Sequence, residues 1–259
     1  MKIIVCIKQV PDTNEVKIDP VKGTLIRDGV PSIINPDDKN ALEEALRLKD
    51  EMGAYVTVLT MGPPQAANAL REALAMGANE AILLSDRAFG GSDTWATSLT
   101  LAKAVEKIGY DIIFAGRQAI DGDTAQVGPE MAEHLGIPQI TYVEKVEVNG
   151  MELKVKKALE DGYETIRVKL PCLLTCIKEL NFPRYMNMYD IFTCFSKDVK
   201  IMTADDLGID KSKLGLLGSP TKVKSSFTKG PKGHGEKIDT TSFESAGIIT
   251  NRLKEKHFI

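Results

Sequence analysis

Residues 116–128 form the stretch of the sequence richest in groups that could bind an anion, reading Gly-Arg-Gln-Ala-Ile-Asp-Gly-Asp-Thr-Ala-Gln-Val-Gly. Its cationic and neutral hydrogen-bonding side chains belong to Arg117, Gln118, Thr124 and Gln126. Gly116 and Gly122 allow a ligand to approach the backbone closely. A helix predicted to begin at Asp123 or Thr124 would offer unpaired N–H groups to phosphate oxygens. An ordinary polar loop with a capped helix explains the same residues, so both interpretations stay open here.

A second polar group, Asn35-Pro36-Asp37-Asp38, has the composition of a helix start. Asn is a good N-cap, Pro suits the first helical position, and acids are stabilised by the helix dipole. Carboxylates would repel a phosphate, so a ligand at this end would present ribose hydroxyls or an adenine amine instead. Capping alone also accounts for these four residues.

Few other side chains could carry out chemistry, because the chain has only three His and four Cys. On a strand, Cys172 and Cys176 would lie about 13 Å apart and could not form a disulfide. Cys6 and Cys194 are isolated, which favours buried thiols over a zinc site and predicts no metal centre. His134, His234 and His257 fall in no acid–base or nucleophile motif, so a bound group is expected to supply the reactivity.

The run Gly90-Gly91-Ser92-Asp93-Thr94 resembles the ATP loop of pyrophosphatase-type enzymes, but Phe89 stands where that loop has serine. The run also follows the third predicted strand instead of the first. A glycine turn whose Ser92 or Asp93 caps the next helix is the simpler interpretation.

Overall charge and composition exclude several classes of protein. A formal charge of -3 and a pI near 5.8 argue against nucleic-acid binding. Residues 1–8 carry too few apolar residues for a secretory signal or a membrane span and are expected to form a buried strand. Together with reduced cysteines, this predicts a cytoplasmic protein without membrane insertion.

Strand and helix patterns alternate over the first half of the chain. Apolar β-branched runs predict strands at 3–8, 55–60, 81–85 and 111–115. Helical spacing predicts helices at 36–52, 65–76, 93–108 and 123–135. This alternation predicts an α/β fold, a Rossmann-like open parallel sheet with helices on both faces.

The second half of the chain follows different patterns. Period-two alternation predicts an antiparallel meander over 140–148, 152–157 and 164–169. Residues 184–189 are bulky and non-periodic, either core or an exposed adhesive loop. Residues 218–237 are rich in Gly, Pro, Ser and Lys and predict an extended arm, followed by a weak helical pattern over 239–259. We expect an α/β domain at 1–217 and an arm with a helix at 218–259.

Taken together, four ordered motifs resemble the beta subunit of electron-transfer flavoproteins over essentially the whole chain. They are Lys8 to Asp12, Ala73 to Ala78, the 116–128 loop, and Asp161 to Thr165 leading to Leu170-Pro171. The resemblance implies an adenine-nucleotide alpha-hydrolase-like sheet and a heterodimer with a larger alpha subunit. It also implies a nucleotide contacted by Cys6, Asn35, Pro36, Asp37, Asp38, Met61, Gly116, Arg117, Gln118, Asp121, Gly122, Asp123, Thr124, Ala125, Gln126 and Val127.

Members of this family fall into two groups, which the resemblance implies differ in the sequence of the 116–128 loop. Carriers hold AMP in this subunit, whereas bifurcating members hold FAD here, reduce it with NADH, and divide the electrons between a high-potential acceptor and ferredoxin or flavodoxin. Gly122 and Ala125 resemble the bifurcating version, in which small residues and Arg117 would accommodate the second phosphate and ring system of FAD. The expectation is therefore FAD, with AMP as the alternative, in an anaerobe.

The resemblance also implies how partners would dock. It assigns the segment with Tyr185, Met186, Met188, Tyr189, Ile191 and Phe192 to an acyl-CoA dehydrogenase such as butyryl-CoA dehydrogenase, with Met188 as an anchor. The arm from residue 218 would clasp the alpha subunit. A nucleotide-binding regulator of the universal-stress type is a different possibility, although such domains usually end after the sheet and would not explain the second half of the chain.

Overall fold

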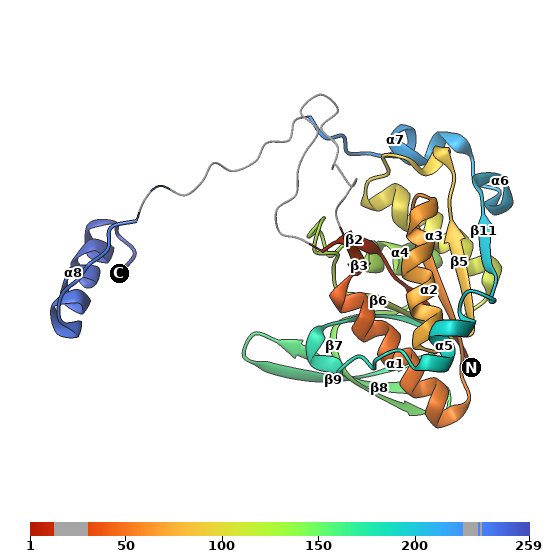
Figure 1. Cartoon of the computed structure of the whole chain (residues 1–259), viewed down its shortest axis with the longest axis horizontal. Coiled ribbons are helices and arrows are strands. Elements are labelled where there is room, and N and C mark those ends of the chain that lie inside the picture. Colours follow the sequence, from red (N-terminus) through yellow and green to blue (C-terminus); the bar gives the residue numbers. More distant parts are fainter. Residues whose placement is uncertain (13–30, 225–232, 234) are drawn as a thin grey trace.

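The computed structural model describes residues 1–12, 31–224, 233 and 235–259, and within them a nine-stranded sheet forms the centre of the protein (Figure 1). The strand order is β11-β5-β4-β1-β6-β10-β7-β8-β9. The bounds are β1 Lys2–Cys6, β4 Tyr55–Met61, β5 Glu80–Leu84, β6 Ile112–Gly116, β7 Gln139–Asn149, β8 Glu152–Leu159, β9 Gly162–Lys169, β10 Cys172–Cys176 and β11 Val199–Met202. All pairs from β11 to β7 are parallel, and β7, β8 and β9 continue the sheet as an antiparallel meander. The predicted fold class is confirmed.

Helices cover both faces of this sheet. Their bounds are α1 Pro36–Met52, α2 Ala67–Met76, α3 Thr94–Ile108, α4 Val127–Leu135, α5 Met188–Thr193, α6 Ala204–Leu207, α7 Gly215–Gly218 and α8 Ser242–Glu255. Successive residues of β6 point to opposite faces, so Phe114 packs in one buried cluster and Ile113 in another. The first cluster includes residues of α1 and α2, and the second includes residues of α3 and α4. No described helix combines the length and apolar character that a membrane span requires.

The predicted helix at 123–135 begins four residues late, at Val127. Asp123 and Ala125 have φ values of 56° and 53°, in the left-handed region that a right-handed helix cannot use. The start predicted at Asp123 or Thr124 is therefore wrong. The sequence patterns also missed β2 (Gln9–Pro11), β3 (Ser32–Ile34) and β11, whose three or four residues are too few to show a period.

The helical pattern near the C-terminus is confirmed by α8, which lies apart from the α/β body in Figure 1 and has no buried residue. Part of the arm predicted over 218–237 falls on residues 225–232 and 234, outside the described residues. Ser219 is still buried, so packing on the α/β body continues slightly beyond the predicted boundary at residue 218.

Candidate functional site

Neighbouring parallel strands end at one edge of the sheet and bring the predicted cofactor residues together. β4, β1 and β6 are adjacent, with Cys6 paired to Leu59 on one side and to Ala115 on the other. Cys6, Met61 and Gly116, which close these strands, therefore share the carboxyl edge where open α/β sheets bind ligands. Burial raises the pKa of the Cys6 thiol to about 12, with Asp38 adding to the effect, so this thiol stays protonated and unreactive.

Asn35 joins the start of α1 to the loop of residues 116–127, which we call the nucleotide loop. Its Nδ2 donates to the Gln118 carbonyl oxygen at 2.8 Å, and its Oδ1 accepts from the Ile120 N–H at 3.0 Å. The side chain makes no capping hydrogen bond to α1, so the predicted side-chain cap is wrong although Asn35 occupies the N-cap position. Because Asn35 is fully buried, its amide shapes the loop from below.

Asp38 fastens two strand ends to α1. Its carboxylate accepts from the Lys8 N–H at 2.7 Å and from the Gly116 N–H at 2.9 Å. Burial raises the pKa of Asp38 to about 7, and hydrogen bonds from Asn35, Lys8 and Gly116 oppose the rise. Both oxygens are engaged within the protein, so this carboxylate holds the edge of the sheet together.

Arg117 is the second residue of the nucleotide loop and lies between α1 and β7. Its Nε is 3.5 Å from the Asp37 carboxylate, and its guanidinium carbon is 5.9 Å from the centre of the Tyr142 ring. That Nε is buried and has no hydrogen-bond acceptor among the described residues. Tyr142 was not predicted. Its φ of 57° lies within β7, where the register with β10 shifts, and no sequence pattern indicated this irregularity.

The remaining loop side chains are partly engaged with one another. Lys8 Nζ lies 2.6 Å from the Asp121 carboxylate, and Gln118 donates to Asp123. Gly122 and Thr124 are exposed. Gln126 is the N-cap of α4 without a capping bond from its side chain. Pro129 has no N–H and the Glu130 N–H donates to the Gln126 carbonyl oxygen, so Val127 and Gly128 supply the first-turn N–H groups that an anion could meet. The helix end that the sequence predicted as an anion site lies at Val127, and anion binding there stays a prediction.

Predicted docking residues are mostly exposed. The exposed fractions are 98% for Tyr185, 69% for Met188, 75% for Tyr189 and 74% for Phe192. Met186 is also exposed, whereas Ile191 packs partly against the core. Two further exposed aromatics, Phe182 and Phe195, flank the predicted segment and were missed. The structure thus favours an adhesive loop over a core segment.

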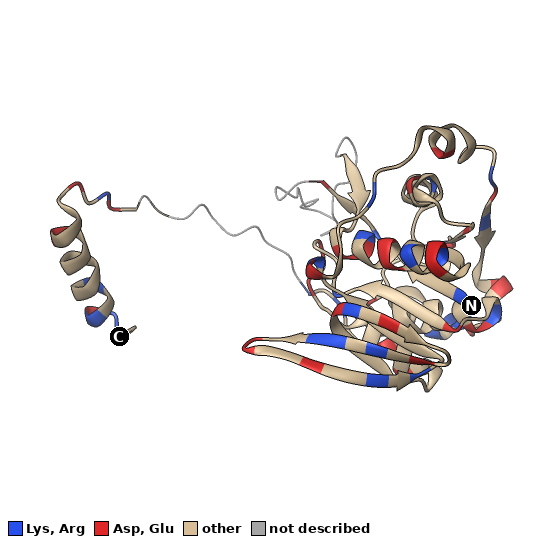
Figure 2. Cartoon of the chain, turned by 90° about the horizontal axis from the view of Figure 1, so that it is seen from below, with Lys and Arg blue, Asp and Glu red and all other residues tan. Residues whose placement is uncertain are grey.

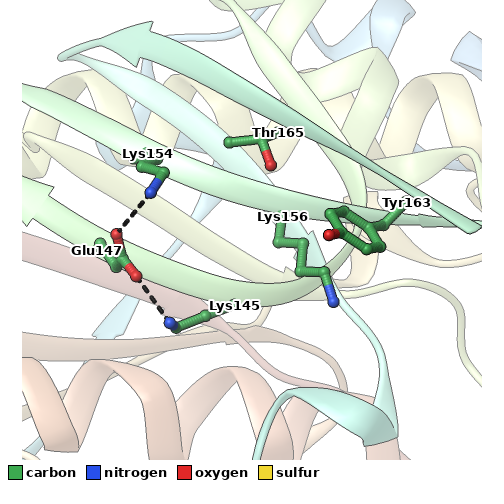
Figure 3. Close-up of a pocket in the computed structure, with 6 residues that line it drawn as sticks. All are labelled: Lys145, Glu147, Lys154, Lys156, Tyr163 and Thr165. Atoms are coloured by element: carbon green, nitrogen blue, oxygen red, sulfur yellow. Dashed lines mark ion pairs between the residues drawn. The ribbon is translucent and has the colours of Figure 1, made fainter.

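A separate shallow hollow lies over the outer face of the meander and was not predicted (Figure 3). Lys145, Glu147, Lys154, Lys156, Tyr163 and Thr165 line it. Glu147 pairs with Lys145 at 2.7 Å and Lys154 at 3.4 Å, and the Lys156 ammonium lies 3.8 Å from the centre of the Tyr163 ring. Figure 2 shows that Lys and Arg recur along these strands. Lys156 also pairs with Glu144 at 2.7 Å, so each lysine of the hollow has an acidic partner.

All four cysteines are unbridged and buried, as predicted. Among the described residues, no group of three His, Cys, Asp or Glu side chains is arranged to hold a metal ion.

Known proteins resemble this chain over most or all of its length. The model of the electron transfer flavoprotein domain matches residues 22–207. The electron transfer flavoprotein subunit beta of Clostridium acetobutylicum is 70% identical over 259 residues. The caffeyl-CoA reductase-Etf complex subunit CarD of Acetobacterium woodii is 58% identical, and the acryloyl-CoA reductase electron transfer subunit gamma of Anaerotignum propionicum is 49% identical. Each of these matches covers 100% of this chain and 100% of the relative.

Proposed function

This chain belongs to the electron transfer flavoprotein family as a beta subunit, and on that premise we propose that its nucleotide loop holds an FAD reduced by NADH. The resemblance inferred from the sequence is confirmed, and the alternative as a universal-stress-type regulator is set aside. Beta subunits of this family pair with an alpha subunit. Bifurcation to ferredoxin or flavodoxin and to an acyl-CoA dehydrogenase is part of the proposal.

The observation that carries the proposal is the combination of an uncapped helix start with an unsatisfied arginine in one loop. The Val127 and Gly128 N–H groups of α4 can hold one phosphate, and the exposed part of the Arg117 guanidinium can meet a second oxygen-rich group. Thr124 is exposed and adds a hydroxyl for the ribityl chain. AMP has a single phosphate and would leave part of this donor set unused.

The side chains near α1 would have divided roles. Asn35 and Asp38 are buried and fully engaged, so they would position the loop. Pro36 is exposed and Asp37 is half-buried, which leaves them as the groups able to meet the adenosine end. Gly122 and Ala125 keep side-chain bulk away from the ring system. When bound, FAD would supply the redox chemistry, by accepting a hydride from NADH.

The names of two relatives guide the choice of partner. One is named for a caffeyl-CoA reductase complex and the other for an acryloyl-CoA reductase. We therefore expect an acyl-CoA dehydrogenase, such as butyryl-CoA dehydrogenase, to dock on the exposed residues of 185–192. The unlinked thiols fit a reducing cytoplasm, and the bifurcating reaction fits an anaerobe.

Counting cofactors in the heterodimer tests the proposal. The chain is purified with its alpha subunit, and flavin and adenine nucleotide are released and quantified. Two FAD per heterodimer and reduction by NADH are expected. One FAD plus one AMP would overturn the bifurcating assignment and leave an AMP-containing carrier.

A substitution tests the loop itself. Arg117→Ala should release FAD from this subunit, because the loop loses its cation. Arg167→Ala, an equal change at an exposed position of β9, should keep the wild-type flavin content. Full flavin content in Arg117→Ala would count against the pocket.

A further inference from the structure

The turn Gly90-Gly91-Ser92-Asp93-Thr94 has no part in the proposed function, yet Asp93 binds two distant parts of the chain. Its Oδ1 accepts from the Ala96 N–H at 3.0 Å and caps α3, as the sequence predicted. Its Oδ2 accepts from the Thr221 N–H at 2.9 Å and hydroxyl at 2.8 Å, and its own N–H donates to Ser219 Oγ at 2.8 Å. A simple helix cap would use only the first of these bonds.

The segment before Thr221 is seated closely on the same turn. The Leu216 N–H donates to the Gly90 carbonyl oxygen at 3.0 Å. A Cβ at Gly215 would lie 2.8 Å from that same oxygen, and the φ of 57° also excludes most side chains. Ser219 is buried and its hydroxyl donates to the Gly215 carbonyl oxygen at 2.7 Å. Residues 219–221, which we call the arm root, are therefore held in a defined place.

Thr94, which follows Asp93, faces the nucleotide loop. Its hydroxyl lies 3.2 Å from Gln126 Oε1 and 3.1 Å from Glu130 Oε1. Ser98 Oγ is 3.2 Å from the other Glu130 oxygen, so α3 and α4 are joined at two points. Gln126 is the N-cap of α4, the helix end at which we propose that a phosphate binds. Two consecutive residues thus contact the arm root and the nucleotide loop.

We propose that Asp93 and Thr94 form a junction that couples nucleotide binding to the seating of the arm root. The coupling rests on the proposed function, because it requires a nucleotide at the start of α4. A ligand that orders Gln126 restrains Thr94 and the first turn of α3, and that turn carries the carboxylate on which Thr221 is seated. Linkage makes the effect reciprocal, so a partner that holds the arm also strengthens nucleotide binding. Asp93 and Thr94 are positioning residues.

Amide hydrogen exchange at Thr221 tests the first half of the proposal, because this N–H donates directly to Asp93. In the heterodimer, Asp93→Ser keeps a capping oxygen for Ala96 but is too short to reach Thr221. Exchange at Thr221 should rise about tenfold, since a hydrogen bond to a charged group shifts an equilibrium by roughly that factor or more. Protection within α3 should stay unchanged.

Asp86→Ser is the matched control. Asp86 also caps a short helix, accepting from the Ala88 N–H, and bridges to the distant Ala204 N–H, but it does not contact the arm root. Exchange at Thr221 should keep its wild-type rate in this variant. Wild-type exchange at Thr221 in Asp93→Ser, or an equal rise in Asp86→Ser, would overturn the junction.

The second half is tested by adding FAD as the probe. Saturating FAD should slow exchange at Thr221 about fivefold in the wild type, the lower end of usual coupling energies. Thr94→Val keeps the shape but removes the hydroxyl, and it should abolish this slowing. Equal slowing in both proteins, or none in the wild type with FAD bound, would overturn the coupling. Failure of FAD to bind at all would instead overturn the proposed function, and AMP would replace FAD as the probe.

Discussion

The nucleotide loop and the proposed docking segment, which we take as residues 182–195 and which includes α5, are both tied to α1, but the ties differ in kind. Asn35 and Asp38 hold the nucleotide loop and are buried, with 0% and 6% of their surfaces exposed. Arg184 holds the docking segment to Glu43 at 2.9 Å and to Asp50 at 2.8 Å, with a third of the arginine side chain in solvent. A buried polar group is costly to leave unpaired, whereas an exposed ion pair contributes little.

The difference follows from what each region presents. The nucleotide loop holds its polar groups in one conformation, which requires hydrogen bonds between its backbone and the buried side chains beneath it. The docking segment presents apolar side chains, and Arg71 Nη1 holds its end by donating to the Cys194 and Lys197 carbonyl oxygens at 2.5 Å each. We therefore expect substitutions under the loop to unfold the protein more readily than substitutions at the docking segment, which should act mainly on partner binding.

The largest effect on stability is expected from Gly116→Ala. A Cβ here would lie 2.7 Å from the Asp38 backbone nitrogen and 2.8 Å from the Asp37 carbonyl carbon, so the backbone itself must move. The free energy of unfolding in urea should fall by about 3 kcal/mol, the upper range for overpacking. At Gly122, a Cβ has Lys8 Nζ at 4.0 Å as its nearest neighbour, so Gly122→Ala should stay within about 0.5 kcal/mol of wild type. Similar losses in both variants would contradict the buried attachment at Gly116.

Asn35→Ala should destabilise the protein by about 2 kcal/mol, because the Gln118 carbonyl and the Ile120 N–H lose a buried partner. The same denaturation measurement applies. Asn68→Ala removes an exposed amide from α2 and serves as the control, with a change within about 0.5 kcal/mol. If Asn35→Ala and Asn68→Ala were equally stable, the buried hydrogen bonds of Asn35 would not contribute more to stability than an exposed amide does.

The pH dependence of stability should reveal Asp38. Its pKa is raised to about 7 in the folded state from an unfolded value of 3.8, so the folded protein holds the proton more tightly. The contribution of Asp38 to stability is therefore greatest below about pH 4 and declines as pH rises to about 7, by at most about 1.4 kcal/mol per pH unit. Stability measured across this window should fall less steeply in Asp38→Asn. Parallel curves for the two proteins would show that this carboxyl does not titrate there.

Arg184→Ala should lower the free energy of unfolding by only about 1 kcal/mol, because its ion pairs are partly solvated. Electron transfer to the proposed acyl-CoA dehydrogenase partner should nevertheless slow, because the segment loses its attachment to α1. Arg184→Lys keeps the charge but not the two-pronged contact with Glu43, and should give an intermediate rate. A loss of stability as large as that of Asn35→Ala would break the distinction between the two regions.

Combined Tyr189→Ala and Phe192→Ala should have the smallest effect on stability, within about 0.5 kcal/mol, because both rings are largely exposed. Electron transfer to the dehydrogenase should fall at least about tenfold, as expected for aromatic anchors of an interface. Met151→Ala, at an exposed position in the turn between β7 and β8, is the control and should transfer electrons at the wild-type rate. An undiminished rate in the double variant would move the docking surface elsewhere.

Local patterns predicted most of the fold. The helix at 36–52 was predicted with its observed bounds, because Pro36, helical spacing and Gly53 mark its ends within a few residues. The meander was also predicted, from its alternation of apolar and charged residues and its turn at Asn149-Gly150. The start of α4 was not predicted correctly. Asp123 and Ala125 adopt left-handed backbone conformations, and neither is a glycine, the residue that would indicate such a conformation.

At the candidate site, the sequence identified the nucleotide loop and the polar start of α1 as the groups of interest, because their residue types are unusual for plain turns. It did not distinguish side chains that could meet a ligand from side chains that hold the loop. Asn35 and Gln118 are 83 positions apart, and no local pattern indicates that the Asn35 amide is already hydrogen-bonded within the protein. Ile191 and Phe192 are likewise similar in sequence but face the core and the solvent.

Residue type and short spacing were enough to predict the alternation of strands and helices, the loop with its arginine, and the family. Which polar groups are hydrogen-bonded inside the protein depends on the three-dimensional fold. Only folding brings Asp93 to Thr221, 128 positions away, where the two residues form two hydrogen bonds at the protein surface. The reason is physical: periodicity is a local property of the chain, whereas hydrogen-bond satisfaction depends on what long-range packing places within reach.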